Sequence, residues 1–288
     1  LYKVAQLIHL SQPALSRQIQ ALEKKLQLNL FDRPGKRLVL TADGKEFLSR
    51  AQQLLDQFDE MLSHVGGFQE GYPNVIRIGA TPQTIAWLVS PAMAEFRQHQ
   101  PQIRFVISEG NNDYLLNMVE RGEVHLVIAN LGVRSTSVGY HLFDARLYAI
   151  LPPGHPLGKE KTVSISDLEH EQLLVMKHGF LTRHIQEQLC AAHDIRPNIL
   201  LESDSTHTLC ALARHNHGVA IVSSSAQDTQ EIQRGIPIVS DRCESSAPVS
   251  AIHNPKRYKS QVMQMFLDTL TTIAATHPNG HQAPSLKP

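Results

Sequence analysis

HLSQPALSRQIQALEKKL, His9–Leu26, is the stretch that decides the fold, because it predicts an amphipathic helix with a defined start. Ser11 is the expected N-cap, and Gln12 and Pro13 fall in the first turn, where the missing N–H of proline costs little. Four apolar residues recur at spacings of four, three and four and share one face: Leu15, Ile19, Leu22 and Leu26. The opposite face is therefore free to contact something else.

That free face is polar and partly basic. It carries Pro13, Arg17, Gln20 and Lys24, with Gln12 and Ser16 beside them. Gln, Ser and Arg side chains can bind base edges and phosphates in the major groove of DNA. An ordinary surface helix is the alternative, since a polar outer face alone is common. The residues expected to contact bases or the adjoining backbone are Ser11, Gln12, Pro13, Ser16, Arg17 and Gln20.

The flanking segments extend this helix to a DNA-binding module. Tyr2–Ile8 is a short helix-like segment, and a two-residue connection joins it to the Ser11 cap, which is the layout of a helix-turn-helix. Downstream, Pro34–Gly35 marks a turn before a strand at Leu38–Leu40. Basic residues cluster around this turn and predict a wing that binds phosphates: Arg33, Lys36 and Arg37.

From Thr41 to about Gly66 the apolar residues follow a heptad pattern. The main seam consists of Phe47, Ala51, Leu54, Phe58, Met61 and Val65, and a second row at strict sevens consists of Leu48, Leu55 and Leu62. A core helix of a single domain is the alternative. The position after a DNA-binding module favours a dimerising helix over residues 42–70, which would place two recognition helices on a two-part DNA site.

Beyond residue 74 the sequence alternates strands and helices. The expected strands are 75–79, 104–110, 126–130, 147–152, 199–204, 219–224 and 247–254. One expected helix follows the first strand and its turn and ends at residue 99. The other expected helices cover 113–121, 182–194, 205–217 and 260–275. This alternation predicts an α/β fold with two lobes and helices on the sheet faces. Residues 277–288 are expected to be a disordered tail.

Polar residues stand where several of these strands end or helices begin. Open α/β sheets bind ligands at such edges, because helix N-termini offer free N–H groups and a positive dipole end. Simple helix capping is the alternative for each residue. The candidate ligand-binding residues are Thr81, Pro82, Gln83, Thr84, Asn130, Phe180, Leu181, Thr182, Asp204 and Ser205. The carboxylate of Asp204 argues mildly against a purely anionic ligand at its edge.

Composition agrees with a DNA-binding protein of two or three domains. The 288 residues hold 27 basic and 27 acidic side chains, yet residues 1–50 hold nine basic and four acidic ones. The basic end is the part expected to face nucleic acid. Three scattered cysteines suggest a reducing compartment, and neither a membrane span nor a signal peptide is visible. We expect a cytoplasmic protein without membrane contact.

The N-terminal motifs occur in a combination that resembles the LysR-type transcriptional regulators. SQPALSRQI begins at Ser11, LF-R at Leu30 and LT-A-G at Leu40, in the order and at the spacing of that family. The resemblance extends over the domain order to about residue 275. It implies a winged helix-turn-helix (1–41), a linker helix (42–70) and a two-lobed effector domain that is similar to periplasmic binding proteins.

The same resemblance implies the lobe boundaries and the function. Lobe I comprises residues 75–146 and 246–276, lobe II comprises 147–245, and two strands cross between the lobes as a hinge. Family members bind double-stranded DNA, and the turns named above contact a small effector that is often a carboxylate. The implied assembly is a homodimer or homotetramer, with RNA polymerase as a candidate partner.

One departure from the family concerns the start of the chain. Family members carry a further helix before the segment that opens here at Leu1, so we expect a truncated and less stable DNA-binding head. The alternative function is therefore a small-molecule-binding dimer that does not bind DNA.

Signals for catalysis, metals and redox sensing are weak. The sequence has no nucleophile elbow, phosphate-binding loop or dinucleotide fingerprint, and its histidines lack zinc-site spacing. We therefore expect no enzyme activity, no metal and no cofactor. Cys190 corresponds to the second cysteine of peroxide-sensing family members, but Leu181 stands where their reactive cysteine would be, so Cys190 is expected to be a small buried apolar residue.

Overall fold

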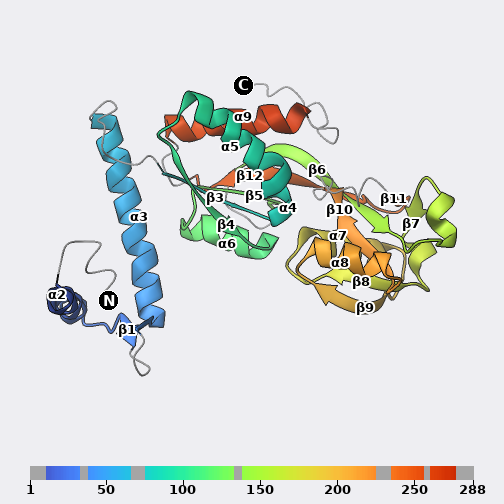
Figure 1. Ribbon diagram of the computed structural model, residues 1–288, viewed down its shortest axis with the longest axis horizontal. Helices are drawn as coiled ribbons and strands as arrows, with labels where there is room; N and C mark the ends of the chain where they lie inside the picture. Colours follow the sequence, from blue (N-terminus) through green and yellow to red (C-terminus); the bar gives the residue numbers. More distant parts are fainter. Residues whose placement is uncertain are drawn as a thin grey trace. The chain divides into compact units, whose positions relative to one another are not determined.

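A computed structural model of the protein describes residues 11–32, 38–65, 75–132, 138–224, 235–255 and 260–276. The chain divides into two compact units, residues 1–72 and 73–288 (Figure 1). The predicted helix at Tyr2–Ile8, the wing residues Arg33, Lys36 and Arg37, and the predicted tail lie outside the described residues.

The first unit contains the predicted amphipathic helix, α2, at Gln12–Leu26. Ser11 caps it as expected, because its Oγ accepts a hydrogen bond from the backbone N–H of Ala14 at 3.3 Å. Gln27, with φ +56°, ends the helix in the left-handed conformation. None of the α2 residues is buried.

A short antiparallel hairpin follows, formed by β1 (Phe31–Asp32) and β2 (Val39–Leu40). The carboxylate of Glu23 fixes its start, since Oε1 accepts from the N–H groups of Leu30 and Phe31 at 2.8 and 3.0 Å. One side chain on α2 therefore satisfies two backbone donors and joins the helix to the hairpin.

Helix α3 (Ala42–Val65) begins directly after the hairpin. Thr41 Oγ1 donates to the carbonyl of Asn29 at 2.6 Å and accepts from the N–H of Gly44 at 2.9 Å. A Cβ at Gly44 would overlap the carbonyl oxygen of Leu30. This close approach requires glycine, and it explains physically why a glycine follows Thr41 at this spacing.

The second unit is built on strands in the order β4-β3-β5-β12-β6-β10-β8-β9; in addition, β11 pairs with β6, and β7 pairs with β11. The strands are β3 (Val75–Ala80), β4 (Arg104–Glu109), β5 (Leu126–Ala129), β6 (Val138–Ile150), β7 (Val163–Ser164), β8 (Gln172–Met176), β9 (Asn198–Ser203), β10 (Val219–Ser223), β11 (Ile236–Val239) and β12 (Ser246–His253). Each end of the sheet is a set of three parallel strands. One set consists of β3, β4 and β5, and the other consists of β8, β9 and β10.

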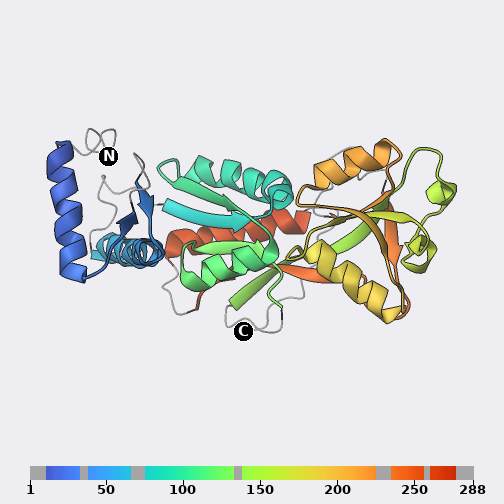
Figure 2. The same ribbon diagram turned by 90° about the horizontal axis from the view of Figure 1, so that it is seen from below.

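Helices cover both faces of each parallel set, as Figures 1 and 2 show. The helices are α4 (Pro82–Thr84), a π-helical turn (Ile85–Val89), α5 (Ser90–His99), α6 (Asn112–Arg121), α7 (Leu181–Ala192), α8 (Thr206–Arg214) and α9 (Gln261–Thr276). In lobe I, α5 and α9 share a core on one face, and α6 packs on the other. In lobe II, α7 and α8 bury their apolar residues in separate cores.

The central strands connect the two parallel sets. In β6, Val138–Arg146 pairs with β12, and Leu147–Ile150 pairs with β10. The strand expected at 147–152 is therefore much longer at its N-terminal side, and it passes from the core of lobe I to the core of lobe II.

The sequence interpretation also missed β8, which lies between β10 and β9 in lobe II. The run QLLVM is short and follows a 3-10 turn at Ser166–Leu168, so no long periodic pattern announces it. The short strands β7 and β11 were missed for the same reason. The other expected strands and helices are present, with ends shifted by a few residues.

Candidate functional site: a DNA-binding face and an effector pocket

The predicted DNA-binding residues of α2 form a largely exposed surface. Ser11, Gln12, Pro13, Arg17 and Gln20 are exposed, whereas Ser16 is half-buried. Ser11 uses its hydroxyl as the helix cap, so this hydroxyl is less available to a ligand than the side chains of its neighbours. Arg17 and Gln20 lie three residues apart on one side of the helix and are free to extend from it.

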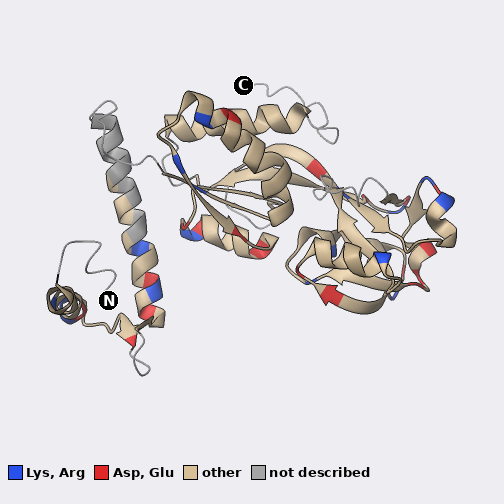
Figure 3. Ribbon diagram, viewed as in Figure 1, with Lys and Arg blue, Asp and Glu red and all other residues tan. Residues whose placement is uncertain are grey.

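Helix α3 exposes apolar side chains that a single chain does not bury. Leu54 is 67% exposed, Phe58 is 51% exposed, and Leu48 and Leu55 are similar. Phe47 and Ala51, nearer the hairpin, are half-buried. The side chains of Met61 and Val65 lie outside the described part of the helix. Acidic and basic residues occupy the first turns (Figure 3), where Glu46 and Arg50 pair at 3.7 Å.

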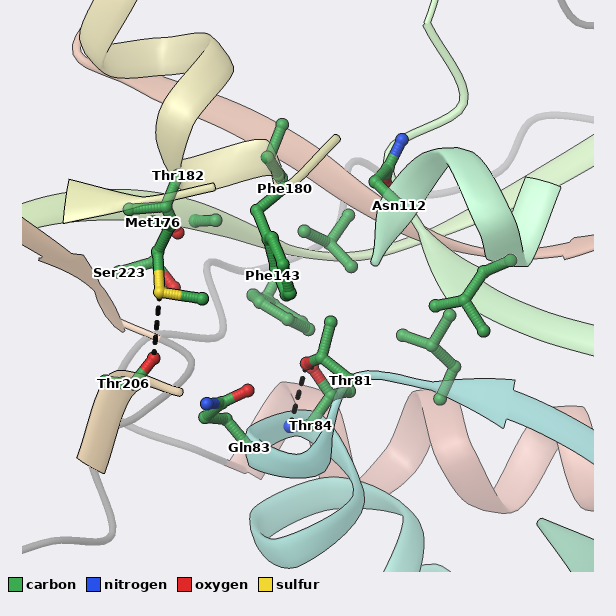
Figure 4. A pocket seen from close by; sticks show the side chains of 15 residues that line it. Thr81, Gln83, Thr84, Asn112, Phe143, Met176, Phe180, Thr182, Thr206 and Ser223 are labelled. Atoms are coloured by element: carbon green, nitrogen blue, oxygen red, sulfur yellow. Dashed lines mark hydrogen bonds between the residues drawn. The ribbon is translucent and has the colours of Figure 1, made fainter. Parts of the chain in front are cut away.

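In the second unit, a pocket lies between lobes I and II and has about 510 Å³ of atom-free space, part of it open to solvent. Figure 4 shows Thr81, Gln83 and Thr84 on one side and Thr182, Thr206 and Ser223 on the other. The lining residues come from both lobes and from the central strands β6 and β12. They are Thr81, Gln83, Thr84, Asn112, Leu115, Ile128, Phe143, Ala145, Met176, Phe180, Leu181, Thr182, Thr206, Ser223 and Val249.

Four helices begin at this pocket, and none of the lining residues is charged. Helix N-termini carry a partial positive charge. Thr81 caps α4, Asn111 caps α6 and Ser205 caps α8 through their side-chain oxygens. Helix α7 differs, because Phe180 at its N-cap makes no side-chain cap hydrogen bond. The first N–H groups of α7 therefore lack the side-chain acceptor that the other three helices have.

Six of the ten predicted ligand-binding residues line the pocket: Thr81, Gln83, Thr84, Phe180, Leu181 and Thr182. Thr81 and Thr84 are joined by their hydroxyls at 3.0 Å. Thr182 is 8% exposed, and its hydroxyl and the amide of Gln83 have no hydrogen-bond partner among the described residues. These two groups are available to a ligand.

The other four predicted residues lie outside the pocket lining. Pro82 is exposed in the first turn of α4, and Ser205 is the cap of α8. Asn130 holds the end of β5 to β12, since its Nδ2 donates to the carbonyl of Pro248 at 2.7 Å. Asp204 is exposed and pairs with Lys177 at 3.1 Å; the hydrogen bond from this ammonium lowers the pKa of the Asp204 carboxyl.

Several lining residues were missed from the sequence. Asn112 begins a helix and Ser223 ends a strand, which is the signal used for the others, but they were not selected, whereas the turn Asp204–Thr206 was among the predicted places and Thr206 lines the pocket. Thr206 Oγ1 lies 3.7 Å from the sulfur of Met176, the last residue of the missed strand β8. Phe143 and Val249 could not be found this way, because they lie inside β6 and β12 and become lining residues only through the strand pairing.

Other chemistry is limited in the part of the chain that the structure describes. No cluster of three His, Cys, Asp or Glu side chains is placed to hold a metal there. None of the helices described is both long and apolar enough to cross a membrane. Cys190 is 5% exposed in the core of lobe II, and burial raises the pKa of its thiol.

Comparison with family models gives two matches that cover most of the chain. Residues 1–45 match the model described as "Bacterial regulatory helix-turn-helix protein, lysR family". Residues 69–275 match the model of the LysR substrate binding domain. The first match favours a DNA-binding regulator over the alternative of a dimer without a DNA-binding role.

Individual relatives are similar. The transcriptional dual regulator GltC of Bacillus subtilis (strain 168) is 28% identical over 231 residues, covering 78% of this chain and 76% of that protein. The RuBisCO operon transcriptional regulator of Allochromatium vinosum is 34% identical over 190 residues, covering 65% of this chain and 62% of that protein.

Among solved structures, a full-length OxyR variant from Pseudomonas aeruginosa has a TM-score of 0.74 at 20% identity, covering 99% of this chain and 93% of that one. The effector-binding domain of QuiR in complex with shikimate has a TM-score of 0.62 at 16% identity, covering 72% of this chain and 99% of that domain. These likenesses support the winged-helix and two-lobed α/β fold. The chain belongs to the LysR family and is a DNA-binding transcriptional regulator that responds to a small-molecule effector.

Proposed function

We propose that the pocket between lobes I and II is the effector site and that the effector is a small organic acid. The observation that carries this proposal is the convergence of four helix N-termini on a pocket that no charged side chain lines. Helix N-termini favour anions, whereas an acidic lining residue would repel them.

The start of α7 is the best position for the carboxylate. Its N–H groups lack a side-chain cap, and the free hydroxyl of Thr182 lies in its first turn. The other three starts already use Thr81, Asn111 or Ser205 as acceptors. A carboxylate at the start of α7 would therefore accept hydrogen bonds from backbone N–H groups for which no described side chain is the acceptor.

The remaining lining suits a compact apolar body with a few polar groups. Phe143, Phe180, Leu115 and Ile128 offer apolar contact, and Gln83 offers an amide on the lobe I side. The similar QuiR domain was solved with shikimate, a cyclic hydroxylated carboxylate. A small ring or short chain with one carboxylate is consistent with this set of side chains.

A thermal-shift titration of the full chain tests the proposal. Shikimate and benzoate would be compared with benzamide, which keeps the ring of benzoate but has no charge. At a hundredfold excess over Kd, a bound acid is expected to stabilise the folded protein by about 2.7 kcal/mol and to raise Tm by about 5 °C or more. Benzamide should produce no comparable shift.

Thr182→Val sharpens the test, because it keeps the shape of the side chain and removes the hydroxyl. It should weaken the response to the acid. Thr272→Val, on the exposed side of α9, is the matched control and should leave the response unchanged. Equal shifts for acid and amide, or equal responses in both variants, would contradict a carboxylate site at α7.

We also propose how the effector site is linked to DNA. The face of α2 with Gln12, Pro13, Ser16 and Arg17 would contact the operator, and the basic wing would hold phosphates. The seam of α3 would pair two chains, and the effector domains would extend the dimer to a tetramer. Effector binding would shift the population between two arrangements of the lobes and so alter the spacing of the DNA-binding heads. RNA polymerase would be the downstream partner, in the cytoplasm.

A further inference from the structure

A direct contact bridges lobes I and II beside the pocket. The N–H of Asp113, in the first turn of α6, donates to the carbonyl oxygen of Gly179 at 3.4 Å. Gly179 lies in the loop between β8 and α7. The residues next to these two, Asn112 and Phe180, both line the pocket (Figure 4). The contact therefore lies at the edge of the pocket.

The approach of the two lobes at this point depends on glycine. Gly179 has φ +87°, and a Cβ there would lie 2.7 Å from Nδ2 and 3.1 Å from Cγ of Asn111. Any larger residue would have to strain the backbone and also displace Asn111. The left-handed backbone and the close approach to Asn111 therefore both favour glycine at position 179.

The lobe I side of the contact is held firmly. Asn111 caps α6, because its Oδ1 accepts from the N–H of Tyr114 at 2.9 Å. The amide of Asn112 binds both backbone groups of Asn130, at 2.7 and 3.2 Å. The start of α6 therefore cannot move away without breaking several other bonds.

The lobe II side is equally anchored. The N–H of Lys177 donates to the carbonyl of Ser203 at 2.9 Å. The side chain of Arg183 is 7% exposed, and its Nη1 donates to the carbonyl of Met176 at 3.2 Å. Its Nη2 lies 3.3 Å from Nε2 of His178, and because a guanidinium only donates, His178 accepts there.

We propose that Gly179 and the Asn111–Asp113 turn form a latch that holds lobes I and II together at the edge of the pocket and must open for a ligand to exchange. Two stiff segments meet through a hydrogen bond near the upper limit of length, so the contact can release while each lobe stays intact. The crossing strands β6 and β12 remain paired on opening and act as the hinge. The latch rests on the proposed function, because it regulates entry to the same pocket.

Hydrogen–deuterium exchange of the full chain, without any ligand, tests the latch. Gly179→Ala should open the contact, and amide exchange should rise about fivefold in residues 111–115 and 177–183, the ratio that loss of one hydrogen bond produces. Gly154→Ala is the matched control, since Gly154 has φ +80° and no neighbour within 4 Å. It imposes the same backbone strain but should leave these segments unchanged.

Two further variants separate the latch from general destabilisation. Asn111→Gly added to Gly179→Ala removes the side-chain atoms that the new Cβ would meet, and glycine remains an acceptable N-cap, so protection should be largely restored. Asp113→Pro removes the donating N–H at the second helical position, where α2 already carries Pro13, and should raise exchange as Gly179→Ala does.

Exchange in Gly179→Ala equal to that in Gly154→Ala, or no recovery in the double variant, would overturn the latch. These outcomes do not depend on the effector. If an acid raises Tm while the exchange results fail, the latch alone is wrong. If exchange responds as expected and no acid binds, the effector proposal alone is wrong.

Discussion

Helices α2 and α7 are both short and amphipathic, but only α7 is buried by its own chain. Helix α7 buries six residues, among them Ile185 and Leu189 in the core of lobe II. Helix α2 buries none; its Ser11 cap and the hydrogen bonds of Glu23 fix its start and join it to the hairpin, and the close approach of Gly44 to Leu30 joins the hairpin to α3. Among the described residues, the first unit depends on a few local contacts, whereas the second depends on extensive packing.

The largest expected effect on folding stability comes from Gly44→Ala. A Cβ at Gly44 would overlap the carbonyl oxygen of Leu30, so the hairpin and the start of α3 must separate. We expect a loss of about 3 kcal/mol in the stability of the first unit and a loss of DNA binding. Calorimetry would follow the two units, and fluorescence anisotropy would follow DNA binding.

Gly158→Ala is the control for that experiment, because no atom lies within 4 Å of its new Cβ. A normal affinity of Gly44→Ala for DNA would show that the local contact is not essential. An equal loss of stability in the second unit would show that the two units do not depend on different kinds of contact.

The next effect concerns the apolar side of α3. Replacing both Leu54 and Phe58 with glutamate should dissociate the dimer that we propose is paired through α3. Burying one such apolar side chain is worth about 1.5–3 kcal/mol, and a two-fold interface loses each twice. Sedimentation velocity would measure the dissociation, with Arg50→Ala as a surface control on the same helix. An unchanged dimer would place the pairing surface elsewhere.

Arg17→Ala tests the face of α2 in a graded way. A side chain that binds a base edge should cost about 1–3 kcal/mol for operator DNA and less for random DNA. Lys25→Ala, in the last turn of α2, should weaken the binding of operator DNA and of random DNA by a similar small amount. Equal losses on both DNAs for Arg17→Ala would limit its role to phosphate binding.

The smallest effect concerns the cysteines of the second unit. Cys190 is buried, and burial raises the pKa of its thiol, so less of it is the reactive thiolate at neutral pH. Cys243 is half-buried and should react first with iodoacetamide, whereas Cys190 should react only when the protein unfolds. Mass spectrometry of the alkylated protein would measure this order. Rapid alkylation of Cys190 in the folded chain would contradict the packing of lobe II.

The sequence predicts the local features of this protein better than its pocket. The Ser11 cap, the hairpin and the strand-helix alternation follow from periodicity and turn residues close in the chain. Thr81 and Thr182 could be found because polar residues at helix starts carry a local signal. Phe143 and Val249 carry none, since their role arises from the pairing of β6 with β12 over a separation of about a hundred residues. Strand β8 was missed for a related reason, because its short sequence carries no periodic signal of its own.

The most direct test of the account is a fluorescence-anisotropy titration of the 288-residue chain with the DNA upstream of its own gene. It would be run at two salt concentrations, with random DNA as competitor and with or without the acid that gives the largest thermal shift. We predict tight binding that survives the competitor, weakens with salt and changes when the acid is added. Binding no tighter than to random DNA, or binding that no effector alters, would contradict a ligand-responsive regulator.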